Sequence, residues 1–74
     1  MFYDAKSSLQ EVVQKGKLGT IQYELLEETG PEHHKEFKCA INIGDKQMGI
    51  GIGKNKKEAE QKAALEALVL LKKQ

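Results

Sequence analysis

Apolar and polar residues alternate in three central segments of the chain, and this pattern predicts three β-strands. Residues 21–25 and 37–43 place an apolar side chain at every second position, which is typical of a strand with one buried face. In residues 48–53 the alternation continues, but glycines occupy the positions between the apolar side chains. Because glycine weakens a strand, we expect the glycine-bearing face to lie close to another element or to bend.

The spacing of apolar residues near the start of the chain is that of a helix. Residues 5–15 carry Leu9, Val12 and Val13 at positions i, i+3 and i+4, which predicts a helix with one apolar side. Asp4 is suited to be its N-cap, because a carboxylate accepts hydrogen bonds from the free backbone N–H groups of a first turn. Gly16 is the expected stop, since glycine readily adopts the left-handed conformation that ends helices.

A second helix is predicted after Asn55, near the end of the chain. Asn55 and Glu58 have the spacing of a capping box, with Asn in the place of Ser or Thr. Small residues dominate the stripe that should face inward, so this helix is expected to approach the sheet closely. The members of that stripe are Ala59, Ala63, Ala64, Ala67, Leu68 and Leu71.

These segments predict an α+β fold with the order α-β-β-β-α. Gly30 and Pro31 interrupt the chain between the first two strands, and Gly44 with Asp45 forms a turn between the last two. A three-stranded antiparallel sheet with two helices on one face satisfies this order. The 74 residues are expected to form a single domain, 1–74, with an ordered core of about 5–73.

Composition narrows the classes of partner. The net charge is only +1, and all twelve cations are lysines, so arginine-based reading of base edges is not expected. The single cysteine, Cys39, excludes an internal disulfide and favours a reducing compartment. No apolar run is long enough to span a membrane and no signal peptide is recognisable, which predicts a cytoplasmic chain without a membrane partner. The short chain is expected to be a piece of a larger protein.

Lysines crowd the predicted start of the second helix, where a cation is unfavourable. A helix N-terminus carries roughly half a positive charge, so acidic residues are the usual choice there. Lys54, Lys56 and Lys57 therefore suggest that an anion, most simply a phosphate, binds at this end.

The chain resembles the double-stranded RNA-binding domain (dsRBD) family, and more narrowly the domain at the end of bacterial ribonuclease III. Four motifs carry the resemblance in the right order over almost the whole chain. They are Tyr23-Glu24-Leu25, the G-P-x-H-x-K-x-F run of residues 30–37, the G-x-G of residues 51–53, and the K-K-x-A-E-x-x-A-A run of residues 56–64.

This resemblance implies binding to double-stranded RNA, by shape and without strong sequence preference, through three regions. The first helix and the loop between the first two strands would touch two successive minor grooves, and the lysine-bearing helix start would hold phosphates between them. Glutamine and serine can donate to and accept from a ribose 2′-hydroxyl, whereas an ionised glutamate only accepts. The implied RNA-binding residues are Ser7, Gln10, Glu11, Gln14, Pro31, His33, Lys35, Lys54, Asn55, Lys56 and Lys57.

Several other interpretations remain open at this point. The polar residues of the first helix and the lysines could be an ordinary solvated surface. A zinc site at His33 and His34 would need Cys39, which the strand pattern directs into the core. A nucleotide-binding loop at residues 49–54 fails the required spacing, which would need glycine at Met48 and serine or threonine at Asn55.

Two rival functions are a protein–protein interaction module and a small enzyme. No nucleophile with a base, paired carboxylates or metal cluster is recognisable, so neither catalytic residues nor a cofactor is expected in this chain. In a ribonuclease III parent, the resemblance implies that a separate nuclease domain would use Mg²⁺ and form the homodimer. The isolated domain is then expected to be monomeric.

Overall fold

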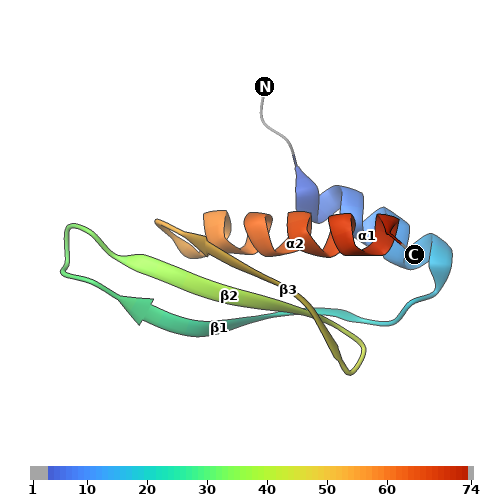
Figure 1. Cartoon of the computed structure of the whole chain (residues 1–74), viewed down its shortest axis with the longest axis horizontal. Coiled ribbons are helices and arrows are strands. Elements are labelled where there is room, and N and C mark those ends of the chain that lie inside the picture. Colours follow the sequence, from blue (N-terminus) through green and yellow to red (C-terminus); the bar gives the residue numbers. More distant parts are fainter. Residues whose placement is uncertain (1–3, 74) are drawn as a thin grey trace.

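The computed structural model describes residues 4–73, and within them the chain forms two helices and one sheet (Figure 1). Their order is α1 (Ala5–Gly16), β1 (Ile21–Thr29), β2 (Glu36–Ile43), β3 (Lys46–Gly53) and α2 (Lys56–Lys72). The strands pair antiparallel in the order β1-β2-β3, and both helices lie on one face of the sheet. The predicted α-β-β-β-α fold is confirmed, whereas residues 1–3 and 74 of the predicted domain lie outside the described part. Neither helix of residues 4–73 is long and apolar enough to cross a membrane.

The glycines of β3 allow α2 to lie directly on that strand. A Cβ atom added to Gly49 would lie 2.6 Å from the carbonyl oxygen of Ala63, and one added to Gly53 would lie 2.7 Å from the backbone nitrogen of Ala59. At Gly51 the added atom would overlap the backbone of α2 as well. The prediction that the glycine-bearing face meets another element is therefore confirmed.

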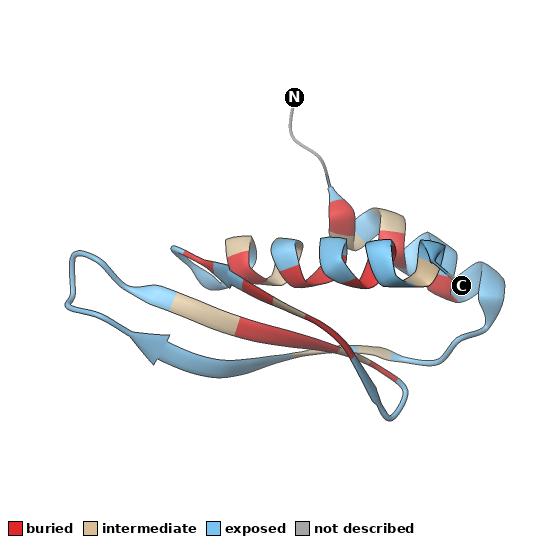
Figure 2. Cartoon of the chain, in the orientation of Figure 1, coloured by how far each residue is buried: buried red, intermediate tan, exposed pale blue. Residues whose placement is uncertain are grey.

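Buried residues lie where the two helices face the sheet, and they come from α1, β2, β3 and α2 (Figure 2). Cys39 and Ile41 of the central strand are fully buried, and the alanines of α2 are buried opposite the sheet. Strand alternation leaves Ile52 on the opposite face, where it is 44% exposed. The core-facing positions of β3 are thus largely its glycines.

Strand β1 extends to Thr29, beyond the predicted segment of residues 21–25. Its pairing with β2 shifts between Leu25 and Glu27, so Leu26 forms a bulge. A bulge places two residues opposite one on the partner strand, which interrupts the alternation of side chains. The apolar pair Leu25 and Leu26 broke the period of two that the prediction relied on.

The buried stripe of α1 is narrower than its sequence pattern predicts. Ala5, Leu9 and Val13 are buried, whereas Val12 is 40% exposed. The buried positions form one row spaced by four, and this row belongs to the same apolar cluster as residues of α2 and of the sheet. The apolar side predicted from Leu9, Val12 and Val13 is therefore only partly buried.

The end of α1 also differs from the prediction in one detail. Gly16 remains helical, and the left-handed residue is Lys17, with φ of 51°. The backbone N–H of Leu18 donates to the carbonyl of Val13 at 3.0 Å, so the chain folds back over the last turn. A Cβ atom on Gly16 would lie 3.1 Å from Cγ of Leu18, which explains why glycine stands one position before the left-handed residue.

Candidate nucleic-acid interface

Two side chains, those of Asn55 and Glu58, accept hydrogen bonds from backbone N–H groups at the start of α2. Asn55 has an extended backbone and its Oδ1 accepts from the backbone N–H of Glu58 at 2.8 Å, so the predicted N-cap is confirmed. The carboxylate of Glu58 reaches back and accepts from the N–H of Lys54 at 2.7 Å. A standard capping box would place this second bond on the N–H of Asn55 itself. The expected reciprocal cap is therefore displaced by one residue.

This capping leaves the neighbouring lysines without an acidic partner. Lys54, Lys56 and Lys57 are exposed, and within residues 4–73 none of the three forms an ion pair. Glu58 is the one acidic residue of the first turn, and its carboxylate is engaged with a backbone N–H. Positive side chains thus add to the positive end of the helix dipole, an arrangement that suits a bound anion.

The β1–β2 loop is held by its own backbone. The N–H of His34 donates to the carbonyl of Pro31 at 2.9 Å, and Gly30 adopts a positive φ of 95°. A Cβ atom at Gly30 would collide with the carbonyl of His34, so the tight turn requires glycine. His33 and Pro31 are exposed on this turn. The loop therefore presents the predicted histidine from a constrained position.

Lys35 lies at the base of the loop and has an acidic neighbour. Its ammonium group is 2.7 Å from a carboxylate oxygen of Glu28 on β1, and both side chains are about two-fifths exposed. This ion pair links the two strands where the loop begins. The positive charge of Lys35, which was predicted to contact RNA, is thus partly neutralised by Glu28. The side chain is still exposed and can contact an anion.

The β1–β2 loop and the start of α2 lie at the same end of the molecule (Figure 1). Residues of both line an open depression of about 920 Å³. The depression thus lies between two of the three predicted contact regions, the β1–β2 loop and the start of α2. Its polar lining includes Lys62, which the sequence-based site prediction missed. Lys62 follows Glu58 by four residues and so shares its side of α2, and this spacing was the available signal. The other polar and charged residues that line the depression are Glu32, His33, His34, Lys35, Glu36, Lys54, Asn55 and Glu58.

The third predicted region is the polar side of α1. Ser7, Gln10, Glu11 and Gln14 are all exposed on it. The hydroxyl of Ser7 donates to a carboxylate oxygen of Asp4 at 2.6 Å, which leaves its lone pairs available to accept from a 2′-hydroxyl. Glu11 lies 3.7 Å from Lys15 in an exposed pair that neutralises little of its charge.

Cys39 and the possible metal ligands were the remaining candidates for a site within residues 4–73. Burial raises the pKa of the Cys39 thiol, so this cysteine is a small, protonated core residue, as its position in β2 predicted. Among residues 4–73, no three His, Cys, Asp or Glu side chains are grouped so that they could hold a metal ion.

The sequence matches a known family and its relatives. A family model described as "Double-stranded RNA binding motif" matches residues 5–71. Ribonuclease 3 of Caldanaerobacter subterraneus subsp. tengcongensis is 56% identical over 68 residues, which cover 92% of this chain and 30% of that protein. Ribonuclease 3 of Geobacillus sp. strain WCH70 is 52% identical over 69 residues, which cover 93% of this chain and 28% of that protein. The chain thus spans less than a third of the length of these curated relatives.

Solved structures agree with the sequence matches. A structure of Arabidopsis HYL1 superposes with a TM-score of 0.80 and 38% identity, covering 95% of this chain and 99% of the other. The first dsRBD of HYL1 gives a TM-score of 0.75 and 40% identity, with 92% and 96% coverage. The likeness therefore covers the order and arrangement of the helices and strands over almost the whole chain.

Proposed function

This chain belongs to the double-stranded RNA binding motif family, and we propose that it binds RNA duplexes by shape and by contacts with phosphates and 2′-hydroxyls, without strong sequence preference. The observation that carries this proposal is the group of exposed lysines at the start of α2, Lys54, Lys56 and Lys57, which have no acidic partner within residues 4–73. Lysine ammonium groups recognise phosphate as point charges and do not select a base sequence. Binding through them is therefore expected to depend on the backbone of the duplex.

The two other contact regions supply preference for RNA over DNA. The residues of α1 offer amide, hydroxyl and carboxylate groups, and these match a 2′-hydroxyl, which both donates and accepts. His33 lies in the β1–β2 loop, whose conformation is constrained by a backbone hydrogen bond and by the positive φ of Gly30. A-form RNA exposes its 2′-hydroxyls in a wide, shallow minor groove, whereas its deep major groove offers mainly phosphates to side chains. The three regions together fit this distribution of groups.

The test is a binding assay with three nucleic acids of one sequence: duplex RNA, duplex DNA and single-stranded RNA. The proposal requires tightest binding to duplex RNA and full competition by an unrelated duplex RNA. Equal affinity for duplex DNA would contradict the role of the 2′-hydroxyl contacts. An absence of binding to all three would favour the alternative of a protein–protein module.

We further propose that this domain is the substrate-binding part of a cytoplasmic ribonuclease III and has no catalytic role of its own. The support is the 56% identity with part of a ribonuclease 3. The Mg²⁺ and the homodimer contacts of such an enzyme would then belong to its nuclease domain.

Incubation of this chain with duplex RNA and Mg²⁺ should leave the RNA intact, and light scattering should report a monomer. Cleavage or a dimer would contradict these two statements.

A further inference from the structure

The first turn of α1 is capped by a side chain of α2, 56 residues away in the sequence. Oε1 of Gln61 accepts from the backbone N–H of Ala5 at 2.8 Å and from that of Lys6 at 3.3 Å. Nε2 of the same amide donates to Oδ1 of Asp4, the N-cap residue, at 3.0 Å. Asp4 in turn accepts from the N–H of Ser7 at 3.2 Å. Three of the four N–H groups that a helix start leaves unpaired are thus satisfied, two of them by a side chain of another helix.

The residue before Gln61 makes a second attachment to the same turn. The ammonium group of Lys6 lies 2.7 Å from a carboxylate oxygen of Glu60, and it also lies 4.6 Å from the centre of the Tyr23 ring on β1. These side chains are partly buried, with 35% of Lys6 and 20% of Glu60 exposed. Burial and the nearby carboxylates of Glu60 and Asp4 raise the pKa of Tyr23 to about 12. One turn of α1 is therefore joined to both α2 and the sheet.

These bonds are directional, and the apolar contact beneath them is not. Ala5, Leu9 and Val13 form a single buried row in the apolar cluster that α2 and the sheet complete. Burial of such a row is favourable over a range of helix rotations and shifts, because the hydrophobic effect depends on area and has no preferred direction. The amide of Gln61 meets Ala5 and Lys6 only at one position of α1. It thereby selects one arrangement among those that the apolar row allows.

The arrangement matters because Gln61 also lies close to the candidate phosphate site. It is five residues beyond Lys56 and four beyond Lys57, which places it about 6–7.5 Å further along α2. Gln61 caps the first turn of α1, and the exposed residues Ser7 and Gln10 lie in the first two turns of that helix. The distance from the phosphate site to the 2′-hydroxyl contacts is therefore set across this capped junction.

We infer that Gln61 is a positioning residue for RNA binding: by capping α1 from α2, it holds the minor-groove contacts of α1 at a fixed distance from the phosphate-binding lysines. The inference rests on the proposed function. It assigns no RNA contact to Gln61 itself. Its effect should appear only with a duplex that engages α1 and the lysines together.

The test compares Gln61→Met with the control Ile43→Val. Methionine is unbranched and has a similar helix propensity, but it cannot reproduce the three hydrogen bonds of the amide. Ile43 is a buried residue of β2, and shortening it lowers stability but leaves in place the hydrogen bonds and the ion pair that join α1 to α2. In the free protein, amide hydrogen exchange at Ala5 and Lys6 should be about five- to tenfold faster in Gln61→Met and unchanged in the control.

RNA binding is then measured with a duplex of about 20 bp and one of about 8 bp, since the family spans ~16 bp. Gln61→Met should weaken binding of the long duplex about tenfold, leave the short duplex nearly unaffected and keep the salt dependence unchanged. Equal weakening of both duplexes, the pattern expected for a loss of folded protein, would overturn the inference, as would unchanged amide exchange. Failure of the wild-type protein to prefer duplex RNA would instead refute the proposed function, and the positioning role with it.

Discussion

Removing the two lysines of the first turn of α2 should weaken RNA binding while making the domain more stable. In Lys56→Ala/Lys57→Ala, both ammonium groups leave the positive end of the helix dipole, where each is unfavourable by a few tenths of a kcal/mol or more. Alanine is also the best helix former. We expect the free energy of unfolding to rise by about 0.5–1 kcal/mol, because no ion pair of residues 4–73 involves either lysine.

The loss in binding follows from counterion release. Each phosphate neutralised by a cation contributes about 0.9 to the slope of log K against log salt for a DNA duplex, and we expect a similar value for RNA. Two lost contacts should flatten the slope by up to about 1.8. Between 50 and 200 mM salt, the affinity of the wild-type protein should therefore fall about tenfold more than that of the variant.

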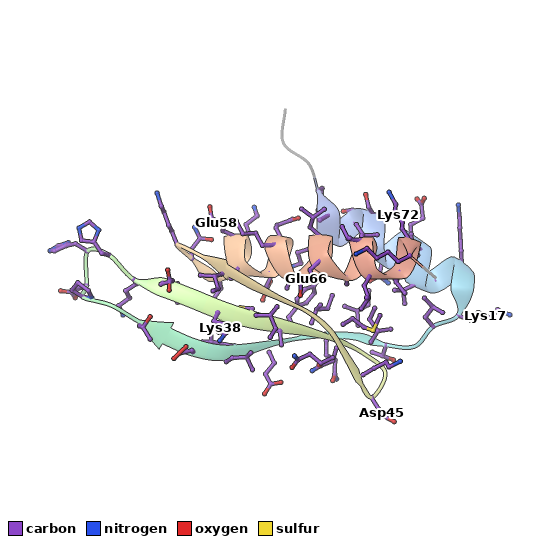
Figure 3. The ribbon with its side chains drawn as sticks, viewed as in Figure 1. Lys17, Lys38, Asp45, Glu58, Glu66 and Lys72 are labelled. Carbon is purple, nitrogen blue, oxygen red and sulfur yellow. The ribbon has the colours of Figure 1, made fainter. Side chains whose placement is uncertain are left out.

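The matched control is Lys72→Ala/Lys73→Ala, at the opposite end of the same helix (Figure 3). It removes the same two charges and likewise changes the net charge from +1 to −1. Cations interact favourably with a helix C-terminus, so this variant should be slightly destabilised and its salt slope should remain that of the wild-type protein. Binding is measured by fluorescence anisotropy at four or more salt concentrations, and stability by urea unfolding.

Two results would refute this reasoning. An unchanged slope in Lys56→Ala/Lys57→Ala would show that these lysines do not meet phosphates. Equal flattening in the control would show that net charge, and not the position of the lysines, governs binding. A variant that binds less tightly only because it unfolds is distinguished by the urea measurement, since we expect a gain in stability.

Three further predictions concern α1. Gln10→Ala or Glu11→Ala should reduce the ratio of affinities for duplex RNA over duplex DNA, and an unchanged ratio in competition assays would exclude a role in sensing the 2′-hydroxyl. Lys17→Gly should stabilise the domain by about 1 kcal/mol in urea unfolding, because φ of 51° is costly for a residue with a Cβ, and a loss of stability would contradict this. Hydrogen bonds from Gln61 and Ser7 lower the pKa of Asp4 from 3.8 to about 2, so its stabilising effect is complete above about pH 4 and is lost as the pH falls towards 2. The difference in unfolding free energy between wild type and Asp4→Asn, which does not titrate, should shrink over this range, and a constant difference would disprove the linkage.

The helices, strands and caps could be predicted from the sequence because they depend on residues that are close together in the chain. Alternation in β2 depends on one strand having one buried face, and the cap at Asn55 depends on a side chain and an N–H three residues apart. The glycines of β3 indicated a close neighbour because they lack a Cβ atom. Motif spacing then identified the family, and with it the three candidate contact regions. The role of individual residues in RNA binding stays a prediction.

Tertiary structure decided what depends on residues far apart in the chain. Whether Val12 or Ala5 completes the buried row of α1 depends on how α1 lies against α2 and the sheet. The pairing of Lys35 with Glu28 follows from the register of β1 and β2 beyond a bulge. The cap that Gln61 places on α1 joins residues 56 positions apart, and no local spacing encodes it. Local preference specifies the elements, whereas the contacts that set the distance between α1 and the lysines of α2 exist only after the elements have packed together.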